Sequence, residues 1–312
     1  MWNNAELGGL AVLRFREIEK SLFKVYSVEA EECFLDMPAL KIKTRVLCMG
    51  TGAPLLFIHG GGGVASQWAP LMAELKNCGR MLIAVDRPGC GLSGAFDYRG
   101  VDLRKHAVTF IDAILEQFGL EKVDIVGNSL GGLWAFWYAH DRPQRVGELI
   151  QLSCPALVLG SGAPMRMRMA TLPLINRLSP MLKPATKESV LAWFSAMGES
   201  GLPAELIEIK LASMRLPWYR RGWYTMLKTL MTMRGVRPHL KLDEKELAEV
   251  RHPTLFVWGK YDPFGGESLA RKVAAMVPGA KLQLIEAAHM PWMKEPGLAG
   301  RVLRDHLGLK SV

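Results

Sequence analysis

The chain has 312 residues, 49% of them hydrophobic and 22% charged, and its formal net charge is +9. A chain of this length and balance can bury one large core and still form a smaller accessory unit. Its apolar runs are shorter than the ~18 residues that a membrane-spanning helix needs. Its five scattered cysteines fit neither a disulfide framework nor metal-ligand spacing, so we expect a reduced, cytoplasmic protein.

The first 26 residues precede the repeating pattern of the chain. They lack the basic start and the long apolar run of a secretion signal. Apolar residues recur among charged ones in this segment, which predicts an amphipathic helix packed on the core, with Leu13, Phe15, Ile18, Leu22 and Phe23 as its apolar positions. We treat residues 1–26 as an N-terminal segment of its own.

From residue 41 onward, apolar runs alternate with helical patterns. The predicted strands are 41–48, 54–59, 81–86, 123–127, 148–152, 254–258 and 281–286. The predicted helices are 65–76, 103–117, 129–140, 267–277 and 298–307. Such alternation is typical of an α/β fold in which helices cover both faces of a mostly parallel sheet. Ligands bind at the carboxyl ends of the strands in folds of this kind, so we expect the active site there.

Four glycines follow the strand at 54–59 and form a loop at residues 60–63. Glycine lets a backbone approach a substrate closely, and its N–H groups can then stabilise a developing oxyanion. We predict that Gly61 or Gly62 donates to such an oxyanion; a merely flexible turn is the alternative. Trp68, shortly after the loop, is a candidate pocket residue.

The segment Val123 to Gly132 reads as a strand that runs into a glycine-framed serine and then into a helix. A G-x-S-x-G pattern in this context predicts a sharp corner that exposes Ser129 as a nucleophile at the start of a helix. The N–H of Leu130, directly after it, is the second predicted oxyanion donor. Asn128, directly before it, is a candidate pocket residue.

About a hundred residues separate the strands at 148–152 and 254–258, which is too many for one crossover. We predict a helical cap at 155–242, inserted into a core formed by 27–154 and 243–312. Residues 151–240 hold twelve Lys and Arg against four Glu, together with nine methionines.

Methionines adapt to varied apolar ligands, so the cap could cover a lipophilic pocket; ordinary helix packing is the alternative. The excess positive charge could form a solvated face, attract an anionic substrate, or contact an anionic membrane surface. No nucleic-acid recognition motif accompanies the charge, so no nucleic-acid partner is expected.

A serine nucleophile needs a histidine to take its proton and a carboxylate to orient that histidine. Asp262 follows the strand at 254–258, and His289 follows the strand at 281–286. Each has a simpler interpretation, because Asp262 could initiate a turn before a proline and His289 could lie on the surface. The chain order Ser, Asp, His at three strand ends favours a catalytic triad. Met290 and Trp292 are further candidate pocket residues.

From about residue 40 to the C-terminus, the chain resembles the α/β-hydrolase fold family, in its lid-bearing, carboxylesterase-like branch. His59-Gly60 with the glycines resembles the oxyanion loop of that family, and residues 127–131 resemble its nucleophile elbow. The turn at 86–93 is similar to the D-x-P-G-x-G-x-S turn of the family, in which Asp86 has a structural role. Residues 289–296 are similar to its histidine loop.

This resemblance implies a serine hydrolase that cleaves carboxylic esters of lipophilic small molecules through an acyl-enzyme, without metal or other cofactor. Two alternatives stay open. Residues 127–132 are also similar to carbon–carbon bond hydrolases that act on ring-cleavage products, although Met290 stands where that subfamily has a tryptophan. A hydrolase-derived receptor for a small molecule is the third hypothesis. Oligomeric state is not readable from the sequence.

Overall fold

The structure is a computed structural model that describes residues 9–172 and 184–309. Its centre is an eight-stranded sheet with the order β1-β2-β4-β3-β5-β6-β9-β10. In this order, β4, β3, β5, β6, β9 and β10 pair in parallel. The pairs β1–β2 and β2–β4 are antiparallel. The strands are β1 (Glu31–Met37), β2 (Ile42–Met49), β3 (Ala53–Ile58), β4 (Arg80–Val85), β5 (Val123–Asn128), β6 (Val146–Leu152), β9 (Thr254–Gly259) and β10 (Lys281–Ile285).

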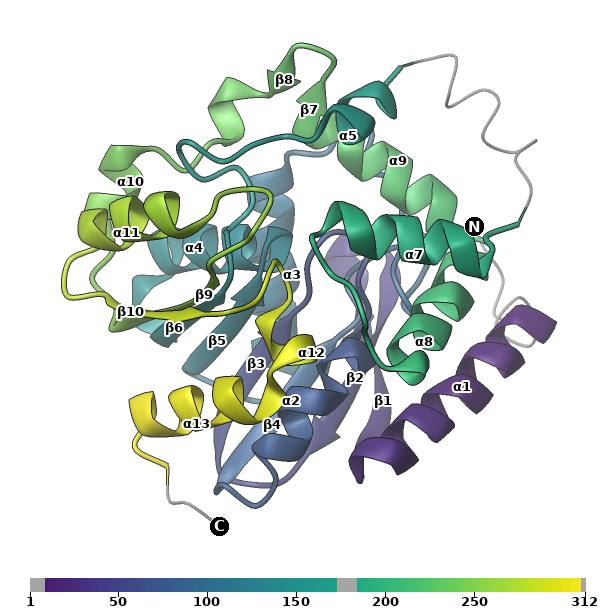
Figure 1. The fold of residues 1–312 in the computed structure, drawn as a ribbon. Coiled ribbons are helices and arrows are strands. Elements are labelled where there is room, and N and C mark those ends of the chain that lie inside the picture. Colours follow the sequence, from purple (N-terminus) through teal and green to yellow (C-terminus); the bar gives the residue numbers. More distant parts are fainter. Residues whose placement is uncertain (1–8, 173–183, 310–312) are drawn as a thin grey trace.

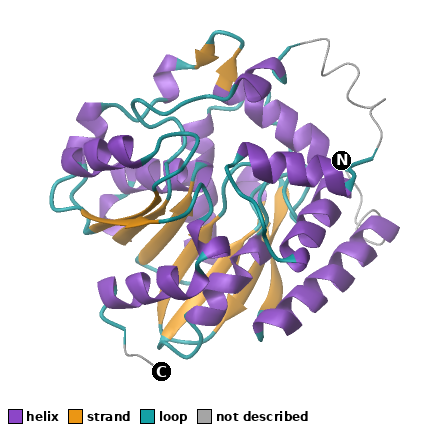
Figure 2. Cartoon of the chain, viewed as in Figure 1, coloured by secondary structure: helices purple, strands orange, loops and turns teal. Residues whose placement is uncertain are grey.

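Helices cover both faces of this sheet (Figures 1 and 2), which confirms the predicted α/β class. Successive residues of a strand point to opposite faces. Accordingly, Leu56 and Ile58 of β3 pack in one apolar cluster, and Leu55 and Phe57 pack in the other. The first cluster includes residues of α3 (Leu103–Gln117), α4 (Leu130–Asp141) and α11 (Glu267–Met276). The second includes residues of α1 (Leu10–Tyr26), α2 (Ala69–Glu74), α12 (Pro291–Lys294) and α13 (Pro296–His306).

Strand β1 and the helix expected at 65–76 differ from the sequence-based expectation. Strand β1 is not predicted, because charged residues interrupt it and only Leu35 and Met37 along it are buried, as suits an edge strand. The helix expected at 65–76 divides into a 3₁₀ turn at Ala65–Trp68 and the helix α2. Pro70 is one of the first residues of α2, where its missing N–H costs no helical hydrogen bond.

The predicted N-terminal amphipathic helix is present as α1, and it packs on the core. It buries Val12, Phe15 and Leu22, whereas Leu13 is 52% exposed, so the assignment of Leu13 to the core face is wrong. The turn of the helix places Val12, and not Leu13, in line with Phe15 and Leu22.

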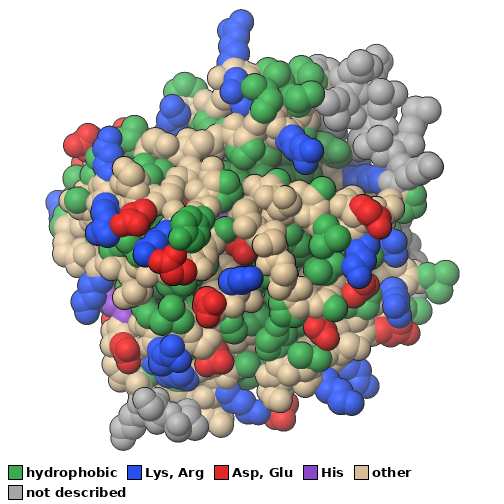
Figure 3. Space-filling view, viewed as in Figure 1, with side chains coloured by type: hydrophobic (Ala, Val, Ile, Leu, Met, Phe, Trp, Pro, Cys, Tyr) green, Lys and Arg blue, Asp and Glu red, His purple; other side chains and the backbone are tan. Residues whose placement is uncertain are grey.

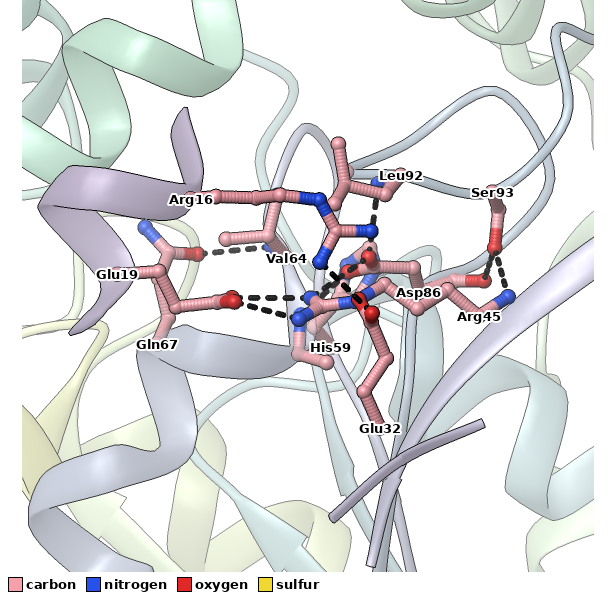
Figure 4. A network of polar contacts seen from close by, with 12 residues as sticks. Arg16, Glu19, Glu32, Arg45, His59, Val64, Gln67, Asp86, Leu92 and Ser93 are labelled. Carbon is pink, nitrogen blue, oxygen red and sulfur yellow. Dashed lines mark hydrogen bonds and ion pairs between the residues drawn. The ribbon is translucent and has the colours of Figure 1, made fainter. Parts of the chain in front are cut away.

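A buried ion network ties α1 to the sheet. The guanidinium of Arg45 contacts the carboxylates of Glu19 on α1, Glu32 on β1, and Asp86 after β4 (Figure 4). Asp86 also accepts the N–H groups of Ala65 and Leu92 at 2.7 and 2.9 Å, and therefore holds its turn, as expected. The network reaches the 3₁₀ turn that follows the glycine loop.

The segment between β6 and β9 folds mainly into helices, and we call residues 155–242 the insertion. Figure 1 shows its helices gathered at the edge of the sheet where the parallel strands end. They are α5 (Met165–Met169), α7 (Lys187–Ala196), α8 (Ala204–Arg215) and α9 (Tyr219–Leu230), followed by a small hairpin of β7 (Met231–Thr232) and β8 (Gly235–Val236). The short helix α10 (Glu244–Glu249) leads back to the core.

Charged side chains of both signs are interspersed over the face seen in Figure 3. One cation counted in the insertion is not at the surface, because Lys210 is fully buried. Within the part of the chain that the structure describes, no helix is both long and apolar enough to span a bilayer.

Candidate active site

Ser129 lies at the corner between β5 and α4, as predicted. Its backbone has φ 51° and ψ −112°, a conformation that non-glycine residues rarely adopt. A Cβ at Gly131 would lie 1.9 Å from the carbonyl oxygen of Ile58, and one at Gly127 would lie 2.6 Å from the Cα of Gly132. Only glycine fits these two positions. The corner therefore presents the serine at the N-terminus of α4, where the helix dipole favours negative charge.

The structure brings the predicted acid and base into direct contact. The Nδ1 atom of His289 and Oδ2 of Asp262 are 2.7 Å apart, and both side chains are buried. Asp262 also accepts the backbone N–H groups of Cys154 at 3.0 Å and Phe264 at 2.9 Å. These bonds hold the carboxylate as an acceptor for Nδ1–H, which leaves Nε2 as the ring atom that can take a proton.

The loop that carries His289 is fixed from two sides. The side-chain amide of Asn128 donates to the carbonyl oxygens of His289 at 3.2 Å and Leu152 at 2.7 Å. From the insertion, the carbonyl of Met197 accepts the His289 N–H, and the carboxylate of Glu199 accepts the Met290 N–H at 2.7 Å. Burial raises the pKa of Glu199.

Sequence reasoning missed Glu199, because its partner lies 91 residues away along the chain. A lone glutamate between Gly198 and Ser200 has no local pattern that would mark it. The sequence predicted Asn128 as a pocket residue, but it did not predict that the Asn128 amide donates to the backbone carbonyls of Leu152 and His289.

A pocket opens beside Ser129 and His289, with about 860 Å³ of empty space, its mouth included. All four predicted pocket residues line it, namely Trp68, Asn128, Met290 and Trp292. Among the described residues, no Lys, Arg, Asp or Glu contributes to its walls. The insertion supplies apolar side chains to the pocket wall, including Met167, Trp193, Met197, Trp223, Leu227 and Met231.

Two tryptophans stiffen the core side of this pocket. The rings of Trp68 and Trp292 lie with their centroids 4.5 Å apart, and Trp68 also packs on Phe57. The indole N–H of Trp292 donates to the carbonyl oxygen of Gln67 at 3.1 Å. These ring contacts and this hydrogen bond hold Trp292 against Trp68 on the core side of the pocket.

The two candidate glycines of the oxyanion loop face different cavities in the structure. Gly61 lines the pocket together with Ser129 and Leu130. Gly62 instead lines a small neighbouring cavity between the loop and α9. Gly60 packs directly behind the nucleophile, since a Cβ there would lie 3.1 Å from the Cβ of Ser129. The close approach of loop and nucleophile corner depends on glycine at position 60.

Lys210 on α8 contacts the other side of this loop. Its ammonium donates to the carbonyl oxygen of Gly62 at 2.6 Å and to the Tyr219 hydroxyl at 3.1 Å, and it lies 3.8 Å from the ring centroid of Trp193. Burial lowers the pKa of Lys210 to about 7, while the nearby Cys90 thiol acts in the opposite direction. The sequence did not distinguish this lysine from the exposed cations of the insertion.

We expect stability to rise with pH because of Lys210. Between its folded pKa of about 7 and its ordinary value of 10.5, the unfolded chain binds a proton that the folded chain does not. The free energy of unfolding should therefore increase by up to about 1.4 kcal/mol per pH unit above pH 7. Urea unfolding from pH 7 to 10 should show this rise in the wild type but not in Lys210→Met. The same rise in both proteins would contradict the prediction, and Lys187→Met, at an exposed lysine, is the control.

Within residues 9–172 and 184–309, no three His, Cys, Asp or Glu side chains are grouped so that they could hold a metal ion. The chemistry that these residues can support is nucleophilic attack by a serine hydroxyl, with proton transfer through a buried histidine and carboxylate.

A model described as the Alpha/beta hydrolase family matches residues 55–299. A 2-hydroxy-6-oxononadienedioate/2-hydroxy-6-oxononatrienedioate hydrolase from Cupriavidus pinatubonensis is 26% identical, over 85% of this chain and 91% of that protein. A 2-hydroxy-6-oxo-6-phenylhexa-2,4-dienoate hydrolase from Burkholderia cepacia is 27% identical, over 75% of this chain and 80% of that protein. The solved structure of the carboxylesterase CesB from Bacillus subtilis is similar with a TM-score of 0.73 and 18% identity, over 95% of this chain and 98% of that chain.

Proposed function

Because the chain belongs to the Alpha/beta hydrolase family, we propose that it is a serine hydrolase with Ser129 as nucleophile, His289 as base and Asp262 as the orienting acid. The contact of 2.7 Å between His289 and Asp262, both buried beside the Ser129 corner, supports this assignment. The protein is proposed to cleave neutral, lipophilic carboxylic esters. The insertion then acts as a cap over the pocket.

In this mechanism the Ser129 hydroxyl attacks the ester carbonyl carbon while Nε2 of His289 takes its proton. The negative charge on the carbonyl oxygen is stabilised by the N–H groups of Leu130 and Gly61. The imidazolium, held by Asp262, then returns the proton to the leaving alcohol, and an acyl-enzyme forms. Water, deprotonated by the same histidine, attacks the acyl-enzyme and releases the carboxylic acid and Ser129.

The observation that carries the substrate class is that the described residues of the pocket wall include no Lys, Arg, Asp or Glu. A carboxylate that enters an apolar pocket without a cation loses its hydration and gains no ion pair, which costs several kcal/mol. No cationic side chain of the described residues lines this pocket. Lys210, the buried cation next to it, is already bonded to Gly62 and Tyr219 and lies behind the glycine loop. A neutral acyl chain packed on Met and Trp side chains fits this environment.

Carbon–carbon bond hydrolysis is the second candidate, and the curated relatives support it more directly than they support esterase activity. Both relatives are named for dienoate or dienedioate substrates, which carry carboxylates. In that reaction, attack of Ser129 or of an activated water on a ketone would be followed by cleavage of a carbon–carbon bond. The described residues that line the pocket include no Lys or Arg to pair with such an anionic substrate, which favours the ester.

Competing substrates on the purified protein separate these candidates. We expect kcat/KM for neutral p-nitrophenyl esters to exceed that for p-nitrophenyl esters of the same length ending in a carboxylate by about 10²-fold. Faster cleavage of a 2-hydroxy-6-oxo-dienoate than of any ester would instead establish the second candidate. A receptor that merely traps its ligand would stop after one equivalent of product, so sustained turnover is the control for that hypothesis.

A further inference from the structure

Arg87 is a buried arginine whose guanidinium contacts the glycine loop and which is not among the described residues that line the pocket. Its side chain is 1% exposed and lies over the ring of Trp134, with Cζ 5.0 Å from the centroid. Nε donates to the carbonyl oxygen of His59 at 3.0 Å, and Nη2 donates to that of Gly60 at 2.7 Å. One planar group therefore holds two successive peptide carbonyls of the loop.

The imidazole of His59 completes this arrangement. Its Nδ1 lies 2.8 Å from the carbonyl oxygen of Gly60, and its Nε2 accepts the backbone N–H of Arg87 at 3.1 Å. A neutral ring with the proton on Nδ1 satisfies both contacts, and burial beside Arg87 lowers the pKa of His59 well below its ordinary value. The Gly60 carbonyl also accepts the N–H of Gly63 at 3.1 Å, so three donors fix its direction.

The direction of a carbonyl fixes the direction of the next N–H. In a trans peptide the two groups point in opposite directions, and the described residues contain no cis peptide bond. Since the Gly60 carbonyl points at Arg87, the N–H of Gly61 points away from Arg87. Of the described residues, those that line the pocket include Gly61 and Ser129 but not Arg87. The Gly61 N–H is thereby directed to the side of the loop where the pocket lies.

We propose that Arg87 is a positioning residue that sets the Gly60–Gly61 peptide so that the Gly61 N–H meets the oxyanion formed at Ser129. This inference rests on the proposed serine hydrolase function. Oxyanion donors accelerate a reaction because they are oriented before charge develops. A run of four glycines has wide conformational freedom and would otherwise lose that order.

Two properties make arginine suited to this role. Its planar fork of donors reaches both carbonyls at once, whereas a lysine is a point donor with a flexible stem. A cationic donor on the Gly60 carbonyl also polarises the peptide, which strengthens the Gly61 N–H as a donor. Replacement by methionine keeps much of the apolar contact with Trp134 but removes both effects.

A matched pair of variants tests the proposal. Arg80 holds the carbonyls of Ala53 and Pro54 with Nε and Nη2, at 2.9 and 3.0 Å, at the opposite end of β3, the strand that leads into the glycine loop. Arg87→Met should lower kcat for p-nitrophenyl esters by about 10²-fold and leave KM within about threefold. Arg80→Met loses a similar pair of bonds far from the pocket, together with the ion pair between Arg80 and Asp124. It should keep the wild-type kcat, with thermal unfolding followed for both proteins.

The affinity of a boronic acid, which forms a tetrahedral adduct with the serine, should fall in Arg87→Met by about the same factor as kcat/KM. In Arg87→Ala, added guanidinium should restore part of kcat, whereas ammonium should not. A folded Arg87→Met with unchanged kcat would overturn the proposal, as would equal losses in Arg80→Met. Labelling of Ser129 by a fluorophosphonate distinguishes failure of the proposed function from failure of the proposed role of Arg87. A wild type that is not labelled contradicts the serine hydrolase function itself. A labelled wild type with unaffected Arg87 variants contradicts only the role of Arg87.

Discussion

Replacing Ser129 by alanine is expected to lower hydrolysis of p-nitrophenyl esters by at least about 10⁴-fold. The substitution removes the only atom that the mechanism uses to attack the carbonyl carbon. It adds no volume at the corner, and the positive φ of 51° remains. The measurement is steady-state hydrolysis over a series of acyl lengths, with wild type and variant at equal protein concentrations determined by absorbance. Turnover that peaks at one acyl length would also indicate the size of the pocket.

The control for this variant is Ser66→Ala, at another buried serine that lies outside the pocket walls. This variant should hydrolyse the same esters at close to the wild-type rate. Activity of Ser129→Ala above about one hundredth of the wild-type value would identify a different nucleophile. Equal loss in both variants would indicate damage to the fold, which far-ultraviolet circular dichroism of the two proteins would reveal.

Asp262→Asn is expected to cause the second large loss, about 10⁴-fold in kcat. In the wild type, Oδ2 accepts both Nδ1–H of His289 and the N–H of Cys154. An asparagine must place an NH₂ group at one of the two positions that the carboxylate oxygens occupy. That NH₂ group is a donor, and it would face the Nδ1–H donor of His289 or the N–H donor of Phe264, so one hydrogen bond is lost. The histidine then adopts the wrong tautomer, and its imidazolium lacks a neighbouring negative charge.

Burst kinetics distinguish this effect from a loss of binding. In Asp262→Asn both acylation and deacylation should slow, while KM changes by only a few-fold, because Asp262 is not among the described residues that line the pocket. The matched control is Asp124→Asn at the start of β5, where the carboxylate accepts the Glu148 N–H at 2.8 Å. Retained kcat in Asp262→Asn, with His289 still required, would show that another group orients the histidine.

The strands and helices that surround the triad could be predicted because each has a strong local pattern. The predicted helix 103–117 begins and ends at the same residues as α3. Asp102 caps its first turn. Strands β3, β4, β5 and β9 are buried apolar runs, and the strand ends that carry Ser129 and Asp262 follow from them. The edge strand β1 escaped prediction, because only its last residues alternate between buried and exposed.

The choice between Gly61 and Gly62 illustrates the limit of a local pattern. Four consecutive glycines are equivalent in sequence, and each can adopt the conformations that a turn requires. Their environments differ only after folding, when Gly61 meets the pocket and the Gly62 carbonyl meets Lys210 from α8. The predicted donor is therefore Gly61, supported by its place in the pocket wall.

The sequence by itself determined the α/β class, the corner at Ser129 and the strand ends after which Asp262 and His289 lie, because these depend on short-range glycine, strand and turn signals. The tertiary structure alone decided the contacts of Arg87, Glu199 and Lys210, whose partners lie 27, 91 and 148 residues away. A charged residue acquires such a role only when folding removes it from water and leaves particular carbonyl or N–H groups as its partners. Nothing in the neighbouring residues encodes which groups those will be.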